Sequence, residues 1–183
     1  MISEEQIKRK QLVEYKKQQR YFLLTSRFNN HTKKENEDYR RRHHINGSIY
    51  CSPGKISEDV PNDANVFVLE MNNDTNEIMA VGWLKNHPLI GKYYVYEENN
   101  YNRYVYRGKR IAREDMSQKE ELIMKVFDIL CFTGNRHLKR GQGLTSFPIE
   151  LLCKYREQLD LVDFIKEMFK NRFVDPEKYK IDK

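Results

Sequence analysis

The sequence predicts a single α+β domain, a small β-barrel or curved mixed sheet packed with C-terminal helices. Residues 66–111 contain four short runs rich in aromatic and β-branched side chains, separated by turn residues, which is typical of strands. Residues 117–132 and 148–173 instead repeat apolar side chains at helical spacing. A chain of 183 residues is long enough to bury one core but not two independent cores.

The N-terminal part predicts one surface helix and one buried strand. Ser3-Glu4-Glu5-Gln6 is a capping box, and the helix that follows to about Gln19 has only a thin apolar stripe. The short apolar run Arg20–Ser26 predicts a buried strand. The almost wholly polar segment Asn29–His44 is either a mobile loop or a solvated helix.

The middle of the chain predicts a sheet of five or six strands. A weak strand signal at Gly47–Cys51 is followed by the clearest hairpin, in which Val66–Met71 and Ile78–Leu84 flank a polar turn. Both runs are apolar on both faces, so we expect these strands to be central. The aromatic runs Lys92–Tyr96 and Tyr101–Ile111 predict two further strands.

The C-terminal part predicts three helices. A second capping box, Ser117–Glu120, begins a strongly amphipathic helix, and Gly134 stands where a C-cap is expected. Pro148 can start a helix that runs to about Tyr155, and the last helix has its apolar face between Leu161 and Phe173. The predicted organisation is therefore a surface helix (1–19), a β-rich core (20–115), a helical part (116–174) and a frayed polar tail (175–183).

The charge balance favours a polyanionic partner. Lys and Arg outnumber Asp and Glu by 33 to 27, which gives a net charge of +6 and a pI near 9.1. Frequent Asn, Lys, Ile and Tyr are typical of an AT-rich genome, such as that of a large DNA virus. We therefore expect nucleic acid, RNA or DNA, as the main partner, with a protein partner as the alternative.

The cysteines and the apolar runs indicate the cellular setting. Cys51, Cys131 and Cys153 are odd in number and far apart, so neither a disulfide framework nor a zinc knuckle is indicated. No apolar run reaches membrane-spanning length, and the N-terminus lacks a secretory signal. We expect an intracellular protein, in the cytoplasm or nucleus or packaged in a virion, with no membrane partner.

Two segments rich in cations and free of carboxylates are candidate phosphate-binding elements. The segment between Glu98 and Glu114 interleaves tyrosines with cations, so it is either a surface for phosphates and bases or an edge strand protected by charge. The segment Thr133–Pro148 has glycines at 141 and 143 whose amides could face an oxyanion. Alternatively, this second segment is a plain helix–helix connection. The candidate contacts are Arg103, Arg107, Lys109, Arg110, Arg136, His137, Lys139, Arg140 and Gln142.

Other chemistry has little support in the sequence. Trp83 is either a core residue or a platform for a stacked base. The pair His43 and His44, even with Cys51, makes no credible metal site, and no catalytic motif or cofactor fingerprint is present. We therefore expect no cofactor and no catalytic residues.

The order of these segments resembles the PUA-like superfamily, the small barrels that include EVE, ASCH and YTH domains. The resemblance covers about Arg20 to Ile111 and rests on Tyr-Phe-Leu-Leu-Thr-Ser, on Pro-Asn-Asp-Ala-Asn-Val-Phe-Val-Leu-Glu and on Ile-Met-Ala-Val-Gly-Trp-Leu-Lys-Asn. It implies a protein that binds RNA or recognises a modified base in an aromatic-lined pocket.

The sequence therefore predicts a protein that binds nucleic acid without altering it. In this hypothesis the cations neutralise phosphates and a pocket near Trp83 accepts a base. A structural or adaptor protein of virion type is the alternative. A nuclease or nucleotide-modifying enzyme that uses Asp63 or Glu70 is the third.

Overall fold

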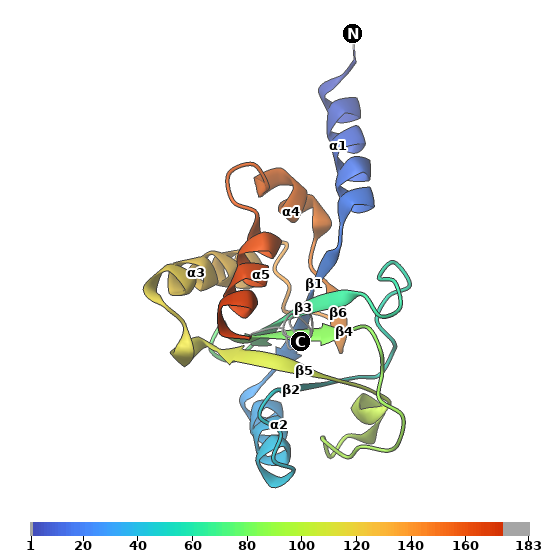
Figure 1. The fold of residues 1–183 in the computed structure, drawn as a ribbon, viewed down its shortest axis with the longest axis vertical. Coiled ribbons are helices and arrows are strands. Elements are labelled where there is room, and N and C mark those ends of the chain that lie inside the picture. The colour runs from blue at the N-terminus through green and yellow to red at the C-terminus, as the bar shows by residue number, and fades with distance from the viewer. Residues whose placement is uncertain (1, 174–183) are drawn as a thin grey trace, which may run out of the picture.

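The computed structural model describes residues 2–173, and in this range six strands form one mixed sheet (Figure 1). The strand order is β2-β5-β4-β3-β1-β6, in which β1 and β3 are parallel and every other neighbouring pair is antiparallel. The strands are β1 (Tyr21–Phe28), β2 (Ser48–Ser52), β3 (Asn65–Asn72), β4 (Glu77–Lys85), β5 (Tyr104–Ala112) and β6 (Leu144–Ser146).

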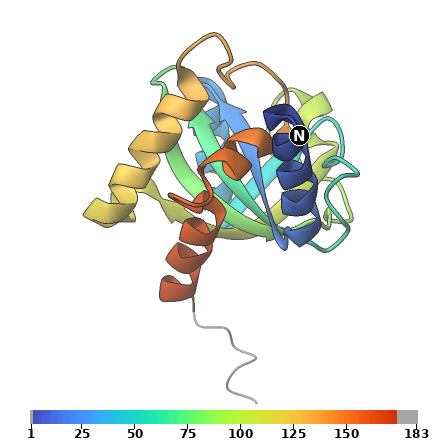
Figure 2. The ribbon, with the colours of Figure 1, turned by 90° about the horizontal axis from the view of Figure 1, so that it is seen from above.

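Five α-helices surround this sheet in the described part of the chain. Figures 1 and 2 show α3, α4 and α5 together on one side of the sheet, α2 on the other, and α1 extending away from the body. The helices are α1 (Glu4–Gln18), α2 (Asn30–Arg42), α3 (Gln118–Phe132), α4 (Ile149–Tyr155) and α5 (Leu161–Arg172), with short 3-10 turns η1 (Asn99–Asn102) and η2 (Arg113–Asp115). The predicted α+β class is confirmed.

The helix starts follow from capping side chains. The capping boxes predicted at Ser3 and Ser117 are both present, and each hydroxyl accepts from the backbone three residues on. Asn29 caps α2 in the same way, because its side chain accepts from the amide of Thr32. The polar segment after β1 is therefore a helix rather than a loop. The predicted tail from Asp175 lies outside the described residues.

Both faces of the sheet are buried. Leu23, Phe67 and Leu69 face α3 and α5, whereas the neighbouring Leu24, Val66 and Val68 fill the concave side. This arrangement explains why the central strands are apolar on both faces, as predicted for the hairpin. The sheet curls until its edges approach each other, and the amide of Leu144 on β6 donates to Ser52 Oγ on β2 at 3.3 Å.

One predicted strand is wrong, and one segment left open contains a further strand. Lys92–Tyr96 is not a strand, because the amides of Val95 and Tyr96 donate to the side-chain oxygen of Asn102 instead of to a neighbouring strand. The connection between α3 and α4 is more than a solvated linker, because it contains β6, in which Thr145 pairs with Thr25 of β1. In the described residues, no helix is both long and apolar enough to cross a membrane.

Candidate ligand-binding site

A cavity of about 420 Å³ opens where the end of β1 meets the start of α2. Its volume lies within the range of small-molecule sites. Five separate parts of the chain build its wall, namely the end of β1 with the start of α2, strand β2, the turn after β3, the irregular segment before β5 and the loop before β6. The lining residues include Ser26, Arg27, Phe28, His31, Glu35, Cys51, Asn73, Tyr96, Glu97, Glu98, Tyr101, Gly141, Gln142 and Gly143.

Arg27 places a partly buried positive charge in this wall. Its Nε donates to the carbonyl of Leu138 at 2.5 Å, and Nη1 donates to Thr145 Oγ1 at 2.9 Å. No Asp or Glu oxygen within residues 2–173 lies within 4.0 Å of this guanidinium. Burial lowers the pKa of Arg27, yet an arginine stays protonated in proteins. The charge is therefore left for an anion to balance.

Asn73 adds a buried hydrogen-bond acceptor to the same wall. Its Nδ2 donates to the carbonyl of Lys139 at 2.9 Å, which fixes the orientation of the side-chain amide. Among the side chains that the structure describes, Asn73 Oδ1 is the only buried polar atom without a partner. A buried acceptor without a donor is costly, so this oxygen favours a ligand that brings one.

The loop before β6 contributes its glycine-rich part to the cavity. Gly141, Gln142 and Gly143 line it, and both glycines have positive φ, +117° and +67°. Arg27 and Asn73 hold this loop through the backbone carbonyls of Leu138 and Lys139. The other predicted contacts of the loop, namely Arg136, His137, Lys139 and Arg140, precede this glycine-rich part in the chain and do not line the cavity, and Arg136 and Arg140 are exposed.

The predicted contacts on β5 and Arg103 just before it lie elsewhere. Arg103 and Arg107 are exposed, and Arg103 lies 6.0 Å from the ring centre of Tyr104. Lys109 lies over the rings of Trp83 and Phe173, at 4.8 Å and 5.0 Å from their centres. Of the cation-rich segment between Glu98 and Glu114, Tyr101 lines the cavity together with the loop before β6, and the cations of that segment do not.

Arg110 points into the concave side of the sheet. Its Nε and Nη2 donate to the two carboxylate oxygens of Glu70 at 3.0 Å and 2.9 Å. The hydroxyl of Tyr50 donates to the same carboxylate at 2.7 Å, and burial, followed by the charge of Glu70, raises the pKa of this tyrosine. The positive charge of Arg110 is therefore balanced inside the protein.

Trp83 belongs to the interface between the sheet and α5. Its ring packs against Phe67 and Phe169, and its Nε1 donates to Asn65 Oδ1 at 3.1 Å. Trp83 lines none of three cavities formed by the described residues, which lie beside α1 and α5, beside α2, and between β1 and the start of α4. The geometry favours the core interpretation of this residue.

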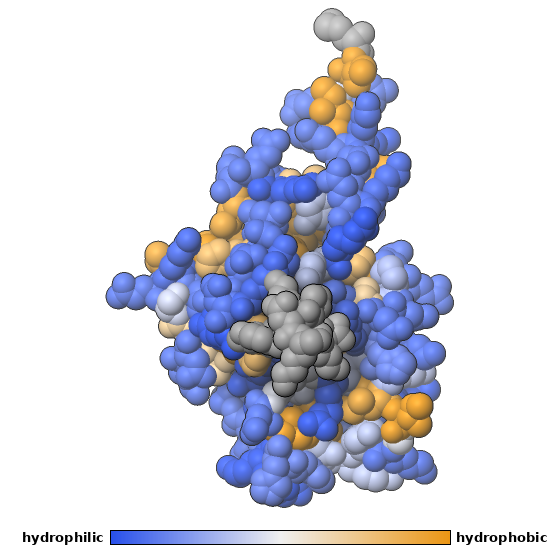
Figure 3. All heavy atoms as spheres, viewed as in Figure 1, coloured by the Kyte–Doolittle hydropathy of each residue, from blue (hydrophilic) through white to orange (hydrophobic). Residues whose placement is uncertain are grey.

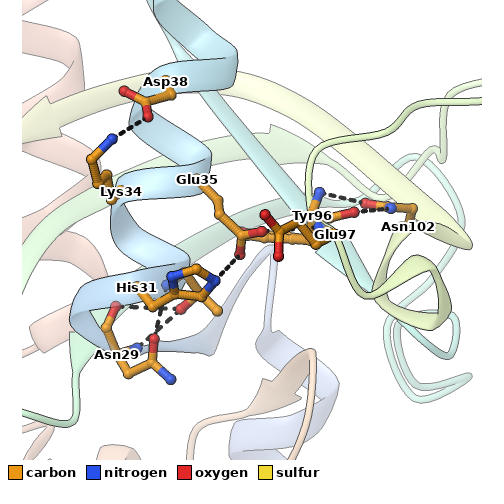
Figure 4. Close-up of polar contacts among 9 residues, drawn as sticks. Asn29, His31, Lys34, Glu35, Asp38, Tyr96, Glu97 and Asn102 are labelled. Atoms are coloured by element: carbon orange, nitrogen blue, oxygen red, sulfur yellow. Dashed lines mark hydrogen bonds and ion pairs between the residues drawn. The ribbon is translucent and has the colours of Figure 1, made fainter.

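Another part of the cavity rim is acidic, and Figure 4 shows Glu35 and Glu97 close together there, beside His31. Glu35 on α2 accepts from the backbone amide of Glu97 at 2.9 Å, and His31 Nε2 lies 3.7 Å from the second oxygen of Glu35. Arg27, Asn73 and the residues of this rim were not among the predicted contacts. One signal was present in the sequence, because Arg27 is a lone cation that continues an apolar strand.

Fold and site together define an α+β protein with a curled mixed sheet and a polar cavity at the end of β1. The cavity has one basic wall and one acidic rim. Comparison with known proteins adds no family, since no family model, curated protein or solved structure matches this chain.

Proposed function

We propose that the protein binds nucleic acid without altering it and that the cavity beside Arg27 receives one nucleotide. The observation that carries this proposal is the partly buried charge of Arg27, which has no carboxylate partner among residues 2–173. Arg136, Lys139 and Arg140 follow in a loop that Arg27 itself anchors, and no carboxylate occurs between Asp128 and Glu150. Phosphate is the anion that such a group of cations suits best.

The remaining wall of the cavity suits a base. Tyr96 and Tyr101 provide aromatic surface, and Asn73 Oδ1 can accept from a ring N–H or an exocyclic amino group. The sequence analysis expected the base near Trp83. We favour the cavity instead, because the Trp83 ring already packs on two aromatic side chains of the core.

Two wider expectations remain part of this proposal. The curled mixed sheet supports the resemblance to PUA-like barrels, many of which bind RNA. Free rather than disulfide-bonded cysteines at positions 51, 131 and 153 support a reducing, intracellular location, including a virion assembled there.

Salt-dependent binding of labelled single-stranded RNA and DNA, followed by fluorescence anisotropy, tests the proposal. Replacing Arg136, Lys139 and Arg140 together by Ala should weaken binding and lower the slope of log K against log salt by about 2. The matched control replaces Lys8, Arg9 and Lys10 of α1, which removes the same charge from an exposed helix. Control binding should stay within about twofold of wild type, since these residues lie outside the cavity.

Two results would contradict the proposal. One is negligible binding of both RNA and DNA at low salt. The other is equal weakening by the loop variant and the α1 variant, which would indicate only a general response to net charge. If Arg27→Gln binds nucleic acid as tightly as wild type, the cavity is not the nucleotide site, although the loop can still contact phosphates.

An adaptor function is the second candidate, and exposed apolar side chains on α1 favour it. Ile7 and Val13 are 46% and 52% exposed, and Figure 3 shows apolar surface at the outer end of this helix. A stable oligomer or a co-purifying protein that is lost when Ile7 and Val13 become Ser, with no nucleic acid carried through purification, would favour this candidate.

A further inference from the structure

His31, Glu35 and Glu97 bring three metal-ligating side chains to one rim of the cavity. One ligand atom from each residue can be chosen so that all three lie within 4.8 Å of one another. An ion with tetrahedral bonds of about 2.1 Å holds neighbouring ligand atoms about 3.4 Å apart. Small side-chain rotations would therefore bring the three ligand atoms to the distances that such an ion requires. We infer that these residues bind a divalent first-row transition-metal ion.

The local charge favours a cation. The carboxylates of Glu35 and Glu97 converge, yet within residues 2–173 no Lys or Arg nitrogen lies within 4.0 Å of either one. The nearby Lys34 is engaged by Asp38 at 2.6 Å and points away from the cluster (Figure 4). In a protein of net charge +6, two adjacent carboxylates without a Lys or Arg partner are an unbalanced pair.

The backbone around the ligands is held in place. His31 and Glu35 are four residues apart and therefore share one face of α2, whose first turn is fixed by the capping box of Asn29 and Thr32. Asn102 fixes the opposite segment, because its side-chain amide bonds the backbone of Val95 and Tyr96 next to Glu97 (Figure 4). Such supporting contacts are what orients ligands in metal sites.

The types of ligand atom limit which metal ions suit the site. An imidazole nitrogen with two carboxylates suits Zn²⁺, Mn²⁺ or Fe²⁺ better than Mg²⁺ or Ca²⁺, which prefer oxygen ligands throughout. Three protein ligands leave coordination positions open to water or to a ligand. The buried acceptor Asn73 Oδ1, which lacks a donor among the described side chains, lines the same cavity on the side of Arg27, and it indicates that the cavity as a whole receives a ligand.

The sequence analysis found no ligand set because the cluster joins distant segments. The His31/Glu35 spacing is visible in the sequence, but many exposed helices contain such pairs as simple i,i+4 contacts. Glu97 is 62 residues from Glu35 and reaches it only because the irregular segment packs on α2.

Titration of the chelator-treated full-length protein with Mn²⁺, without nucleic acid, tests the site. Bound Mn²⁺ loses its free-ion electron paramagnetic resonance signal, and buried thiols do not compete for this ion as they would for Zn²⁺. We expect saturable binding of one ion per chain. Glu35→Gln, Glu97→Gln and His31→Ala should each weaken binding by about tenfold or more. The matched control Glu37→Gln, on the same helix but paired with Lys33, should bind as wild type does.

Thermal unfolding gives a second measurement, which distinguishes metal binding by Glu97 from a purely structural role of this residue. Without metal, Glu97→Gln should be at least as stable as wild type, because it relieves repulsion with Glu35. With Mn²⁺, wild type should gain stability by mass action and this variant should not. Non-saturable binding, or wild-type affinity in both Glu variants, would overturn the inference. Neither result bears on nucleic-acid binding, which is measured separately.

Discussion

Glu70 is the acceptor for three donors inside the curled sheet, two from Arg110 and one from Tyr50. Replacing it with Gln removes the counter-charge of Arg110, whose side chain is only 15% exposed. We expect a loss of about 3 kcal/mol or more in the free energy of unfolding, measured with urea at neutral pH, because an unpaired buried charge is strongly destabilising.

The exposed pair of Lys33 and Glu37 provides the comparison for this prediction. Glu37→Gln should change the free energy of unfolding by less than about 1 kcal/mol, since exposed ion pairs contribute little. Similar small effects for Glu70→Gln would mean that water reaches Arg110 and that the pair is not buried in solution.

The three cysteines should differ in reactivity. Burial raises the pKa of the Cys131 thiol to about 12 and also raises the pKa of the buried Cys51, while Cys153 is only half-buried. Because the thiolate is the reactive form, we expect one thiol to react quickly with a disulfide reagent at about pH 8, and three after unfolding. Cys153→Ser should abolish the fast reaction. Rapid labelling of a second thiol in the folded protein would mean that Cys51 on β2 or Cys131 on α3 is accessible and not buried.

Closure of the sheet depends on the glycine just before β6. Gly143 has φ +67°, and a Cβ there would lie 2.1 Å from Ser52 Oγ of β2. Gly143→Ala should therefore cost about 2 kcal/mol or more in unfolding free energy, from backbone strain together with overpacking. Gly134→Ala is the control, since Gly134 also has positive φ but has open space around it, and its cost should be about 1 kcal/mol. Equal costs would show that the contact between β6 and β2 adds nothing.

The attachment of α5 to α3 should make stability depend on pH. Arg172 donates to both oxygens of Glu120 at 2.8 Å and 2.6 Å, and this hydrogen bonding lowers the pKa of that carboxyl group. The stabilisation is complete above the unfolded pKa of about 4.3 and is lost as the pH falls through the lower folded value. Glu120→Gln should therefore be less stable than wild type at pH 7, and the difference should shrink below about pH 4. A difference in the free energy of unfolding that stays constant across this pH range would mean that Arg172 does not lower the pKa of Glu120.

The elements that could be predicted from sequence are those whose signals are local. The capping boxes at Ser3 and Ser117 and the hairpin of β3 and β4 need only neighbouring residues to specify them. β6 has only three residues and is a strand because β1 pairs with it, which no local pattern indicates. Conversely, Lys92–Tyr96 has the composition of a strand, but Asn102 takes its backbone hydrogen bonds.

At the scale of the whole molecule, the cavity could not be predicted because five segments that are far apart in the sequence form it. Gln142 was a candidate from sequence and does line the cavity, whereas Arg110 was an equal candidate and is paired with the carboxylate of Glu70. Composition shows how many cations a chain has, while the fold decides which of them keep a free charge. Arg27 is the clearest case, since a single arginine in a strand is unremarkable until its surroundings are known.

The pairing of β1 with β6 also constrains how the protein is made. Thr25 and Thr145 are partners across 120 residues, so β1 leaves the ribosome long before its outer neighbour is synthesised. During that interval the nascent chain exposes an unpaired strand edge that carries Leu23 and Leu24, which is a template for aggregation. Production of this protein should therefore benefit from slow translation or from chaperones that shield β1 until the last strand arrives.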